Sequence, residues 1–365
     1  MRALVLGRGK SGEASAALLR SCGYAVDFVD GYDLVVASPG LPVKSELQLG
    51  CEELKRRGWK LLAVTGSKGK SSVVKIVADA IGGVPCGNYG RPVTDLVSER
   101  PGWAVVEVSS FQLETTTLAP DTFEAAAILN LQEDHLDRHG SVEVYHGLKR
   151  KLLTMAKREI GPASPDSDSP LWTGSYFDNE ILAGNAAMAV ELMRVAGLDD
   201  VTVAKAFRNF TPLPHRMNLI AEINGVRYID DSKATSLAAL IAGVKMAPSG
   251  NRTIEQSNNR TVLLIAGGLP KGDDPKSALP TLTERVKKVY LIGQCAEVFH
   301  AAWKGVVDCE ICGTMDKAVE HVAREAENGE TVLLSPGTAS FDQFKSFGER
   351  GEVFARLVKE KEKQR

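Results

Sequence analysis

Residues Val64–Val73 read VTGSKGKSSV, and this stretch decides the fold of the chain. The apolar run Leu61–Val64 leads into it and predicts a buried β-strand, and the residues from Ser71 onward have the pattern of an α-helix. A glycine turn between a strand and a helix is typical of a phosphate loop, whose usual spacing is G-x-x-x-x-G-K-[ST]. Here Gly66–Ser71 give G-x-x-G-K-S, which is two residues shorter. Three interpretations are open: a damaged nucleotide site, a chance cluster of small residues, or a different phosphate loop.

The same succession of strand, glycine turn and helix runs along the whole chain. Short apolar runs that end in Gly, Ser or Asp alternate with helical patterns such as SGEASAALLRSCG. Such runs suit strands buried on both faces of parallel sheets, so the alternation predicts an α/β fold. The runs are RALVLGRG, DLVVASPG, KLLAVTGSKG, WAVVEVSS, AAAILNL, VRYIDDS, TVLLIAGG, KVYLIG and TVLLSPG. Ligands of open sheets bind at the carboxyl ends of strands, where these glycine-rich loops lie.

The length of 365 residues predicts two or three domains. The Pro- and Ser-rich stretch 158–175 indicates a loop, the polar stretch 247–260 an exposed excursion, and FTPLPHR a boundary. We therefore predict three domains, over residues 1–60, 61–211 and 212–365.

Composition excludes several classes of protein. Apolar residues make up 44% of the chain and charged residues 25%, as in ordinary soluble globular proteins. The formal net charge of −2 argues against electrostatic binding to nucleic acid or to an anionic membrane. No apolar run approaches the ~18 residues that span a bilayer, and the N-terminal run breaks at Gly7, which favours a first strand over a signal peptide.

The six cysteines show no paired framework. Cys309 and Cys312 form a C-x-x-C, but the sequence has no second pair and no thioredoxin-like context, which a metal or redox site would need. This pattern favours structural or incidental thiols and a reducing cytoplasm.

A first glycine cluster, Gly7, Gly9 and Gly12 in VLGRGKSG, follows a strand and opens a helix. Asp30 ends the next predicted strand, so the region matches the dinucleotide fingerprint G-x-G-x-x-G with a distal acid. A plain strand–turn–helix connection needs glycines too. The pattern therefore leaves open a phosphate or nucleotide group here and, as a more distant alternative, the nicotinamide cofactor of a dehydrogenase.

The second loop predicts an anion site. Backbone N–H groups over Gly66–Ser71 are expected to converge on an anion at a helix N-terminus. Lys70 is suited to neutralise the β- and γ-phosphates of a nucleotide, and the Ser71 hydroxyl is suited to ligate Mg²⁺. The alternative is a glycine-rich turn with an exposed lysine.

Acidic and imidazole groups follow two further strands. Glu107 lies within a buried strand, where a carboxylate is costly unless it is paired or bound to a cation. His135 stands between Asp134 and Asp137 after another strand, which favours a metal or substrate ligand over a structural histidine. Lys149 lies on a predicted helix, and its sequence neighbours indicate only a solvated lysine.

The last third of the chain has polar groups after three apolar strands, in IDDSKATS, AGGLPKG and LLSPGTASFDQFKSFGERG. With the PHRM segment they predict a rim that binds an anionic substrate. The residues singled out are His215, Arg216, Asp231, Lys233, Thr235, Lys271, Ser335, Ser340 and Phe347.

Together these motifs resemble the Mur ligase superfamily, whose ATP loop reads G-x-x-G-K-[ST]-[ST]. They occur in the family's order over nearly the whole chain: VTGSKGKSS, GNYGRP, EVSSFQLE, LNLQEDHLDRHG, LPHRM, IDDSKATS, AGGLPKG and LLSPGTASFDQFKSFGERG. SSFQLE, DDSKAT and SFDQFK resemble the branch that adds D-glutamate to UDP-N-acetylmuramoyl-L-alanine.

The resemblance implies a Rossmann-like N-terminal domain for the uridine nucleotide, a P-loop ATPase-like central domain and a Rossmann-like C-terminal domain for the amino acid. It implies an ATP-dependent ligase that forms an amide through an acyl phosphate in peptidoglycan precursor synthesis. Its implied partners are small molecules, with no nucleic acid and no membrane, and it implies a cytoplasmic monomer.

The resemblance also implies a role for each matching residue. Lys70 and Ser71 match residues that hold the ATP phosphates and a first Mg²⁺, with Glu107 as a further ligand of that ion. His135 matches a ligand of a second Mg²⁺. Lys149 matches the family lysine that becomes carbamylated, which implies an anionic ligand in place of a solvated cation.

The other implied contacts form three groups. The ATP loop comprises Gly66, Ser67, Lys68, Gly69, Lys70, Ser71 and Ser72, with further nucleotide contacts from Asn185, Arg216 and Asp231. The UDP-muramoyl substrate is matched to Asn88 and Ser109, with candidates for its uridine end at Arg8, Lys10, Ser11, Ser38, Pro39 and Gly40. D-Glutamate positions fall on Lys233, Thr235, Lys271, Ser340, Phe341 and Phe347.

The chain departs from the family pattern in three places. Ile181 and Leu182 stand where the family has the His and Asn that contact adenine. The central domain is shortened between Lys157 and Phe177, and the N-terminal domain lacks a strand and a helix after Asp30. Two alternatives follow: another Mur or folylpolyglutamate-type ligase, or a degenerate, non-catalytic nucleotide-binding homologue.

Overall fold

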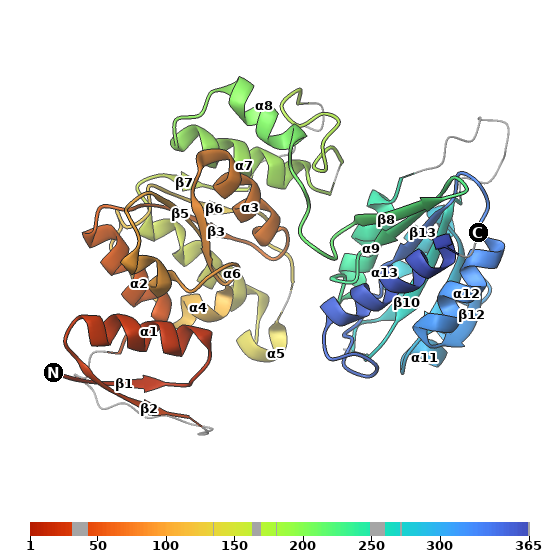
Figure 1. The fold of residues 1–365 in the computed structure, drawn as a ribbon, viewed down its shortest axis with the longest axis horizontal. Coiled ribbons are helices and arrows are strands. Elements are labelled where there is room, and N and C mark those ends of the chain that lie inside the picture. The colour runs from red at the N-terminus through yellow and green to blue at the C-terminus, as the bar shows by residue number, and fades with distance from the viewer. Residues whose placement is uncertain are drawn as a thin grey trace. The chain divides into compact units, whose positions relative to one another are not determined.

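The structure is a computed structural model, and it describes residues 1–30, 43–133, 135–162, 169–179, 181–248, 260–270 and 272–363. The contacts of the chain divide it into two compact units, Met1–Thr211 and Pro212–Arg365 (Figure 1). None of the helices in the described ranges combines the length and apolar character needed to cross a bilayer.

A five-stranded parallel sheet in the order β4-β5-β3-β6-β7 forms the centre of the first unit. The residues Leu61–Val64 are fully buried, as their apolar character predicts. The strand β3 lies in the middle, where the chain switches from one side of the sheet to the other, and ligands of open α/β sheets bind at such a point. The strands are β3 (Lys60–Thr65), β4 (Val84–Gly87), β5 (Trp103–Glu107), β6 (Ala125–Ile128) and β7 (Glu159–Ile160).

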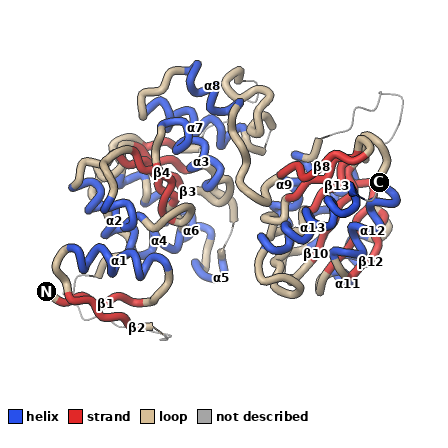
Figure 2. Tube along the Cα trace, in the orientation of Figure 1, coloured by secondary structure: helices blue, strands red, loops and turns tan. Residues whose placement is uncertain are grey.

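Helices cover this sheet on both faces (Figure 2). On one face α3 (Lys70–Ile81) packs with α7 (Ala183–Val195) and α8 (Asp200–Arg208). On the other, α2 (Glu46–Arg56) and the 3-10 helix η1 (Val93–Ser98) share a core with the strands. The remaining helices of this unit are α4 (Ser110–Thr115), α5 (Leu136–His139), α6 (Val142–Lys151) and η2 (Leu153–Met155).

A small parallel pair, β1 (Arg2–Leu6) and β2 (Ala25–Val29), is joined by α1 (Lys10–Ser21). The helix lies so close to the first loop that a Cβ on Gly12 would sit 2.1 Å from the carbonyl oxygen of Gly7. The glycine is therefore required there by close packing, whether or not a nucleotide binds.

The N-terminal elements share their core with the central sheet. Leu18 of α1 and Leu47 and Leu54 of α2 belong to the same hydrophobic cluster as Leu61 of β3. The contacts therefore mark no boundary at residue 60, and a separate domain over residues 1–60 stays a prediction. The predicted strand DLVVASPG lies outside the described residues.

The second unit contains a six-stranded sheet in the order β12-β11-β10-β13-β9-β8. All neighbouring strands are parallel except β8, which pairs with β9 in an antiparallel hairpin. The turn residues Asn224 and Gly225 have φ angles of 52° and 74°, as a two-residue hairpin turn requires. The strands are β8 (Asn218–Ile223), β9 (Val226–Asp230), β10 (Val262–Gly267), β11 (Val286–Ile292), β12 (Asp308–Gly313) and β13 (Thr331–Leu334).

Two hydrophobic cores lie on opposite faces of this sheet. One core holds side chains of α9 (Leu237–Met246), η3 (Pro275–Ala278), α10 (Leu279–Arg285) and α11 (Ala296–Trp303). The other holds side chains of α12 (Met315–Glu325) and α13 (Phe347–Lys363). The predicted α/β class with mostly parallel sheets is confirmed.

Four of the strands in the described residues were not predicted from the sequence, and these are β4, β7, β8 and β12. Residues 158–175, predicted as a loop, begin with the short strand β7 and contain the buried Trp172. The Asn-Gly pair was a sequence signal for the β8–β9 hairpin that the prediction did not use.

The strand β12 carries the C-x-x-C motif. Cys309 packs against the core of α9, α10 and α11, whereas Cys312 belongs to the core of α12 and α13. The sheet separates the two thiols, so they do not form a redox pair or ligate one ion together.

Candidate active site

The stretch VTGSKGKSSV forms the end of β3, a tight loop and the start of α3. Gly69 caps the helix with a φ of 85°, a left-handed conformation that favours glycine. A Cβ on Gly69 would also lie 2.0 Å from Nδ2 of Asn185. The loop therefore depends on glycine for its backbone conformation and for its close packing against α7.

Asn130, which follows β6, holds this loop in place. Its carbonyl oxygen accepts a hydrogen bond from the Ser67 amide (3.0 Å), and its side chain exchanges two bonds of 2.9 Å with the backbone of Lys68. Its Nδ2 also donates to Oδ1 of Asn185 (3.2 Å). The amides of Ser67 and Lys68 donate to Asn130, so the expectation that all the amides over Gly66–Ser71 converge on an anion is wrong for these two. The prediction of an anion site therefore rests on the amides in the first turn of α3.

Two lysines donate to the carbonyl oxygen of Gly66. The Lys70 ammonium lies 2.9 Å from it and 3.2 Å from the Ser67 carbonyl oxygen. Lys149, at the last turn of α6, donates to the same Gly66 oxygen over 2.8 Å. Lys149 is only 1% exposed, so the interpretation of a solvated lysine is wrong. Two like charges this close repel each other, and the repulsion is stronger away from water.

Glu107, the last residue of β5, is 2% exposed. Its Oε1 accepts a hydrogen bond from Nδ2 of Asn88 (2.7 Å), whereas Oε2 is buried with no hydrogen-bond partner in the described parts of the chain. A buried carboxylate oxygen without a partner is costly unless a cation binds it. Carboxylate oxygens are the ligands that Mg²⁺ prefers, so this residue fits a magnesium ion.

Tyr145 connects the predicted site residues of the central sheet. Its hydroxyl donates to Oγ of Ser67 (3.2 Å), and its ring lies 4.4 Å from the Lys149 ammonium. The ring centroid is 6.3 Å from that of His135, which is exposed and also contacts Phe111 at 5.0 Å. The sequence indicated no role for Tyr145, although its spacing of four residues from Lys149 places both on one face of a helix.

The segment after β5 is fixed by its own side chains. Ser109 caps α4 through a capping box with Gln112. The buried His139 bridges this helix to α5, with Nε2 3.0 Å from Oγ of Ser110 and Nδ1 3.2 Å from Glu114. These bonds hold Ser109 near the carboxyl end of β5.

The residues predicted for the uridine end lie near β1. Arg8 stacks on Phe28 at 4.7 Å and approaches Asp30 at 3.7 Å, and Lys10 and Ser11 are exposed at the start of α1. The other three predicted positions, Ser38, Pro39 and Gly40, lie outside the described residues. A uridine site here stays a prediction.

In the second unit, two aspartates end β9 and begin the next loop. Oδ2 of Asp230 lies 2.7 Å from Nδ1 of His215, and Oδ2 of Asp231 accepts a hydrogen bond from Oγ of Ser335 (3.0 Å). Burial raises the pKa of Asp231 to about 7, and the Ser335 bond and the nearby charge of Arg216 act against this shift. The predicted nucleotide residues Arg216 and Asp231 therefore lie near enough for the charge of one to act on the other, with no direct hydrogen bond or ion pair between them among the described contacts.

Arg350, at the start of α13, is fully buried and joins two loops at this edge. Its Nε and Nη2 donate to Oγ and the carbonyl oxygen of Ser232 (3.0 and 2.9 Å). Its guanidinium also donates to the carbonyl oxygens of Thr338 (3.2 Å) and Ala339 (3.3 Å). Burial lowers the pKa of Arg350 to about 10. Arg350 precedes the buried Phe354 by one turn, so both lie on the same apolar face of α13. A charged residue on such a face was the sequence signal that could have identified Arg350 as a buried residue.

The residues predicted for D-glutamate gather around the loops after β9 and β13. The Lys233 ammonium lies 3.8 Å above the ring of Phe347, and the Phe347 carbonyl oxygen accepts a bond from Oγ of Ser232. Ser340 is buried, Thr235 is half-buried and Phe341 is 70% exposed. Lys271 lies outside the described residues.

The predicted nucleotide contacts are divided between the units. Asn185 lies in the first unit, and Arg216 and Asp231 lie in the second. One nucleotide site built from all three stays a prediction.

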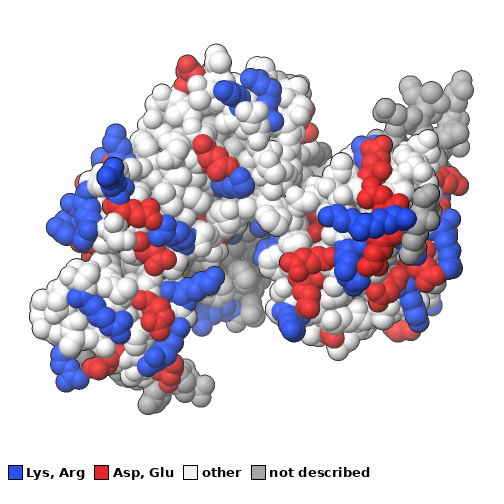
Figure 3. Space-filling model, in the orientation of Figure 1, with Lys and Arg blue, Asp and Glu red and all other residues white. Residues whose placement is uncertain are grey.

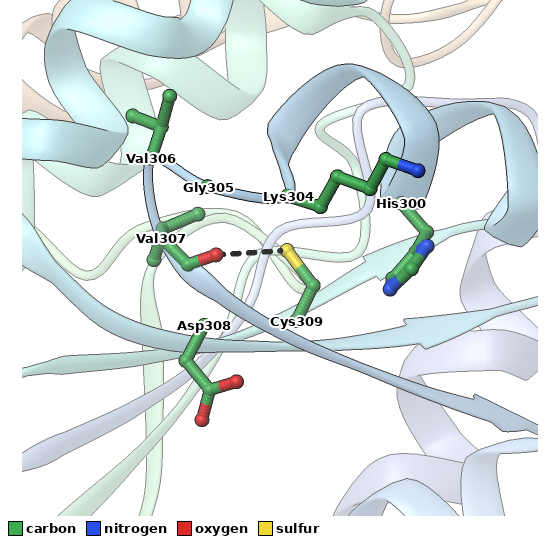
Figure 4. A pocket seen from close by; sticks show the side chains of 7 residues that line it. All are labelled: His300, Lys304, Gly305, Val306, Val307, Asp308 and Cys309. Atoms are coloured by element: carbon green, nitrogen blue, oxygen red, sulfur yellow. Dashed lines mark hydrogen bonds between the residues drawn. The ribbon is translucent and has the colours of Figure 1, made fainter.

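A pocket of about 380 Å³ lies in the second unit at the amino-terminal end of β12, which is the end of the strand away from the predicted site residues (Figure 4). It is lined by His300, Lys304, Gly305, Val306, Val307, Asp308 and Cys309, none of which is a predicted site residue.

Comparison with protein families gives two matches. The model of the Mur ligase middle domain matches residues 88–163, and that of the Mur ligase glutamate ligase domain matches residues 215–337.

Known relatives match over most of the chain. The UDP-N-acetylmuramoylalanine--D-glutamate ligase of Nitratidesulfovibrio vulgaris is 33% identical over 94% of this chain and 81% of its own length. The enzyme of the same name from Elusimicrobium minutum is 29% identical over 98% of this chain and 97% of its own. The latter alignment runs over 452 residues, more than the 365 of this chain, so that relative has segments with no counterpart here.

Among solved structures, the MurF ligase from Thermotoga maritima in complex with ADP has a TM-score of 0.65 and covers 100% of this chain and 95% of that one. Its sequence identity of 16% makes this a likeness of fold.

Proposed function

The chain belongs to the Mur ligase family, and from this premise we propose that it adds D-glutamate to UDP-N-acetylmuramoyl-L-alanine, with ATP as energy source, in peptidoglycan precursor synthesis. The observation that carries the reaction class is that two buried charged residues lie beside the phosphate loop. Lys149 donates to the Gly66 carbonyl oxygen, and Glu107 pairs in register with Val64, two residues before Gly66. The names of the relatives supply the acceptor and the amino acid.

The chemistry requires activation, because an amide does not form spontaneously from a carboxylate and an amine in water. In the proposed reaction the carboxylate of the muramoyl-alanine attacks the γ-phosphorus of ATP, the bond to ADP breaks, and an acyl phosphate forms. The amine of D-glutamate then attacks the acyl carbon, phosphate leaves, and the amine loses a proton. Positioning and neutralisation of charge do most of the work in phosphoryl transfer, a task that suits Lys70 and the first turn of α3.

Two magnesium ions complete the proposed site. Ser71 and Glu107 would hold one ion, and His135 with carbamylated Lys149 would hold the other. Bound Mg²⁺ supplies neutralisation of the phosphates and of the substrate carboxylate. The unpartnered Oε2 of Glu107 supports the first of these assignments.

The surroundings of Lys149 support its carbamylation. Its amine is buried and shares the Gly66 carbonyl oxygen with the Lys70 ammonium. The Lys149 ammonium first loses a proton, and the neutral amine then adds to CO₂, which forms an N–C bond, breaks one C–O π bond and releases a second proton to give an anionic carbamate. This change replaces repulsion between two cations by attraction between the carbamate and the Lys70 ammonium.

For the second unit we propose that Lys233, Thr235, Lys271, Ser340, Phe341 and Phe347 bind D-glutamate. Arg350 acts as a positioning residue, because it ties the loop after β9 to the loop after β13. The substrates of this reaction are cytoplasmic small molecules, and we propose a cytoplasmic monomer.

The test is a phosphate-release assay with ATP, Mg²⁺ and UDP-N-acetylmuramoyl-L-alanine, with D-glutamate, L-glutamate, L-lysine and diaminopimelate offered in turn. We expect release that requires both the acceptor and D-glutamate. Release with another amino acid would assign a different ligase of the family. Release without either substrate, or ATP binding without turnover, would exclude the proposed ligase.

A further inference from the structure

A second group of metal-binding side chains lies in the second unit, on β12 and α12, and includes none of the site residues described above. Glu310 and Cys312 come from β12 and His321 from α12. One ligand atom from each lies within 4.8 Å of the other two. We propose that these three residues bind a divalent transition-metal ion of the Zn²⁺ class.

The donor types select this class of ion. A thiol, an imidazole and a carboxylate are ligands of Zn²⁺, at distances of about 2.0–2.3 Å. Sulfur disfavours Mg²⁺ and Ca²⁺, which take oxygen ligands, so this site differs in preference from the one at Glu107. The donors lie within 4.8 Å of one another, and an ion bound between them would replace the hydrogen bond between Nδ1 of His321 and Oε1 of Glu310.

The backbone of β12 places two of the donors on one face. The register of β12 against β11 shifts between Leu291 and Ile292, and this irregularity lies beside Cys312. Cys312 is 5% exposed, whereas the side chains of Glu310 and His321 are 30% and 34% exposed. An ion can therefore enter from solvent past Glu310 and His321 and reach the buried sulfur.

The local charge favours a further cation. The Lys288 ammonium lies 2.8 Å from Glu310 and from Glu325 and 3.9 Å from Asp308, so three carboxylates share one ammonium group. Tyr290 donates a hydrogen bond of 2.9 Å to Glu325. Figure 3 shows acidic and basic side chains interspersed on the visible face of this unit. Lys288 and Glu325 would form the outer contacts that orient a metal ligand.

The carboxyl end of β12 also contacts the predicted D-glutamate loop. Nε2 of Gln343 donates to the carbonyl oxygen of Gly313, the residue after Cys312, over 2.8 Å. An ion on Cys312 would therefore stabilise the strand end on which that loop rests.

The test is a Co²⁺ titration of the full-length, reduced, metal-free protein, followed by the near-ultraviolet charge-transfer band between thiolate and Co²⁺. We expect one equivalent with this band, and loss of the band in Cys312→Ser. Cys309→Ser should keep it, because that thiol of the same C-x-x-C lies on the other face of the sheet. A magnesium site at Glu107 contains no sulfur, so Co²⁺ bound there gives no such band.

Two further variants keep the test decisive if Cys312→Ser does not fold. His321→Ala and Glu310→Gln alter partly exposed side chains, and each should weaken Co²⁺ binding by more than the roughly 10–100-fold that loss of an outer contact costs. Absence of the band in the unaltered protein would overturn the proposal and leave an ion-pair network. Loss of the band in Cys309→Ser would also overturn the proposal. So would an unchanged band and unchanged Co²⁺ affinity in Cys312→Ser, His321→Ala and Glu310→Gln.

Discussion

The carboxyl edges of the two sheets hold their buried charges in different ways. In the first unit Oε2 of Glu107 has no hydrogen-bond partner within the described ranges, and Lys149 shares the Gly66 oxygen with Lys70. In the second unit the buried guanidinium of Arg350 donates to a hydroxyl and three carbonyl oxygens of the protein. At the first edge, one oxygen of a buried carboxylate lacks a hydrogen-bond partner among the residues that the structure describes, and a ligand could supply one. At the second edge, the protein itself supplies the hydrogen-bond partners of the buried charge.

This difference predicts different results of mutation. Variants at the first edge should change the rate of the reaction and leave stability largely intact. Variants at the second should change stability and, through it, the binding of the amino acid.

The largest effect is expected for Lys149→Ala. Turnover should fall by roughly 10³-fold or more, because a ligand of the reacting centre is lost, and short carboxylates such as acetate should restore part of it. The measurement is phosphate release with and without added carboxylate. Arg150→Ala, an exposed cation on the same helix, is the matched control. Unchanged turnover in Lys149→Ala would remove the carbamate from the proposal.

Glu107→Gln should lower kcat by about 10²–10³-fold while the protein stays as stable or becomes slightly more so, because a buried charge is removed. Steady-state kinetics and urea unfolding measure the two effects. Glu124→Gln is the control, since Glu124 pairs with Lys157 at the surface at 2.8 Å. A large loss of stability without a loss of kcat would show that Glu107 is structural.

At the second edge, Arg350→Ala should lower local stability by about 3 kcal/mol, because buried carbonyl groups lose their donors. Hydrogen exchange of peptides from β9 and β13 measures this, with peptides from β3 and β5 as internal reference. Arg350→Lys should recover part of the loss and show a higher KM for D-glutamate with little change in kcat. Equal changes in exchange across both units would contradict a role confined to this edge.

The effect that is smallest per unit change of the variable concerns Asp231 and pH. Burial raises its folded-state pKa to about 7 from the ordinary 3.8, so the folded protein keeps a proton that the unfolded chain has lost. The stability of the second unit should therefore fall as pH rises from about 4 to about 7, by up to about 1.4 kcal/mol per pH unit. Asp231→Asn should flatten this dependence in urea unfolding, and the exposed Asp316→Asn should not. An unchanged slope in Asp231→Asn would assign the dependence to other groups.

Much of the fold follows from local patterns. The apolar runs predicted β1, β3, β5, β6, β9, β10, β11 and β13, and the strand predicted to end at Asp30 is β2. The glycine spacing predicted the strand–loop–helix of the phosphate loop. Glu107 could be singled out because a charged residue inside an apolar strand is costly wherever the strand packs. The strands that were missed are short, half-exposed or interrupted by cysteine and glycine, so their apolar pattern is weak.

The amino-acid sequence by itself determined where strands, turns and the phosphate loop lie, because these depend on neighbours a few residues apart. Tertiary structure alone decided that Lys149 is buried, since its partner Gly66 is 83 residues away, and that Arg350 holds Ser232 across 118 residues. It also decided that Cys309 and Cys312 face opposite cores. Burial and charge pairing arise when distant segments pack together, so only the folded chain fixes which groups are left for ligands.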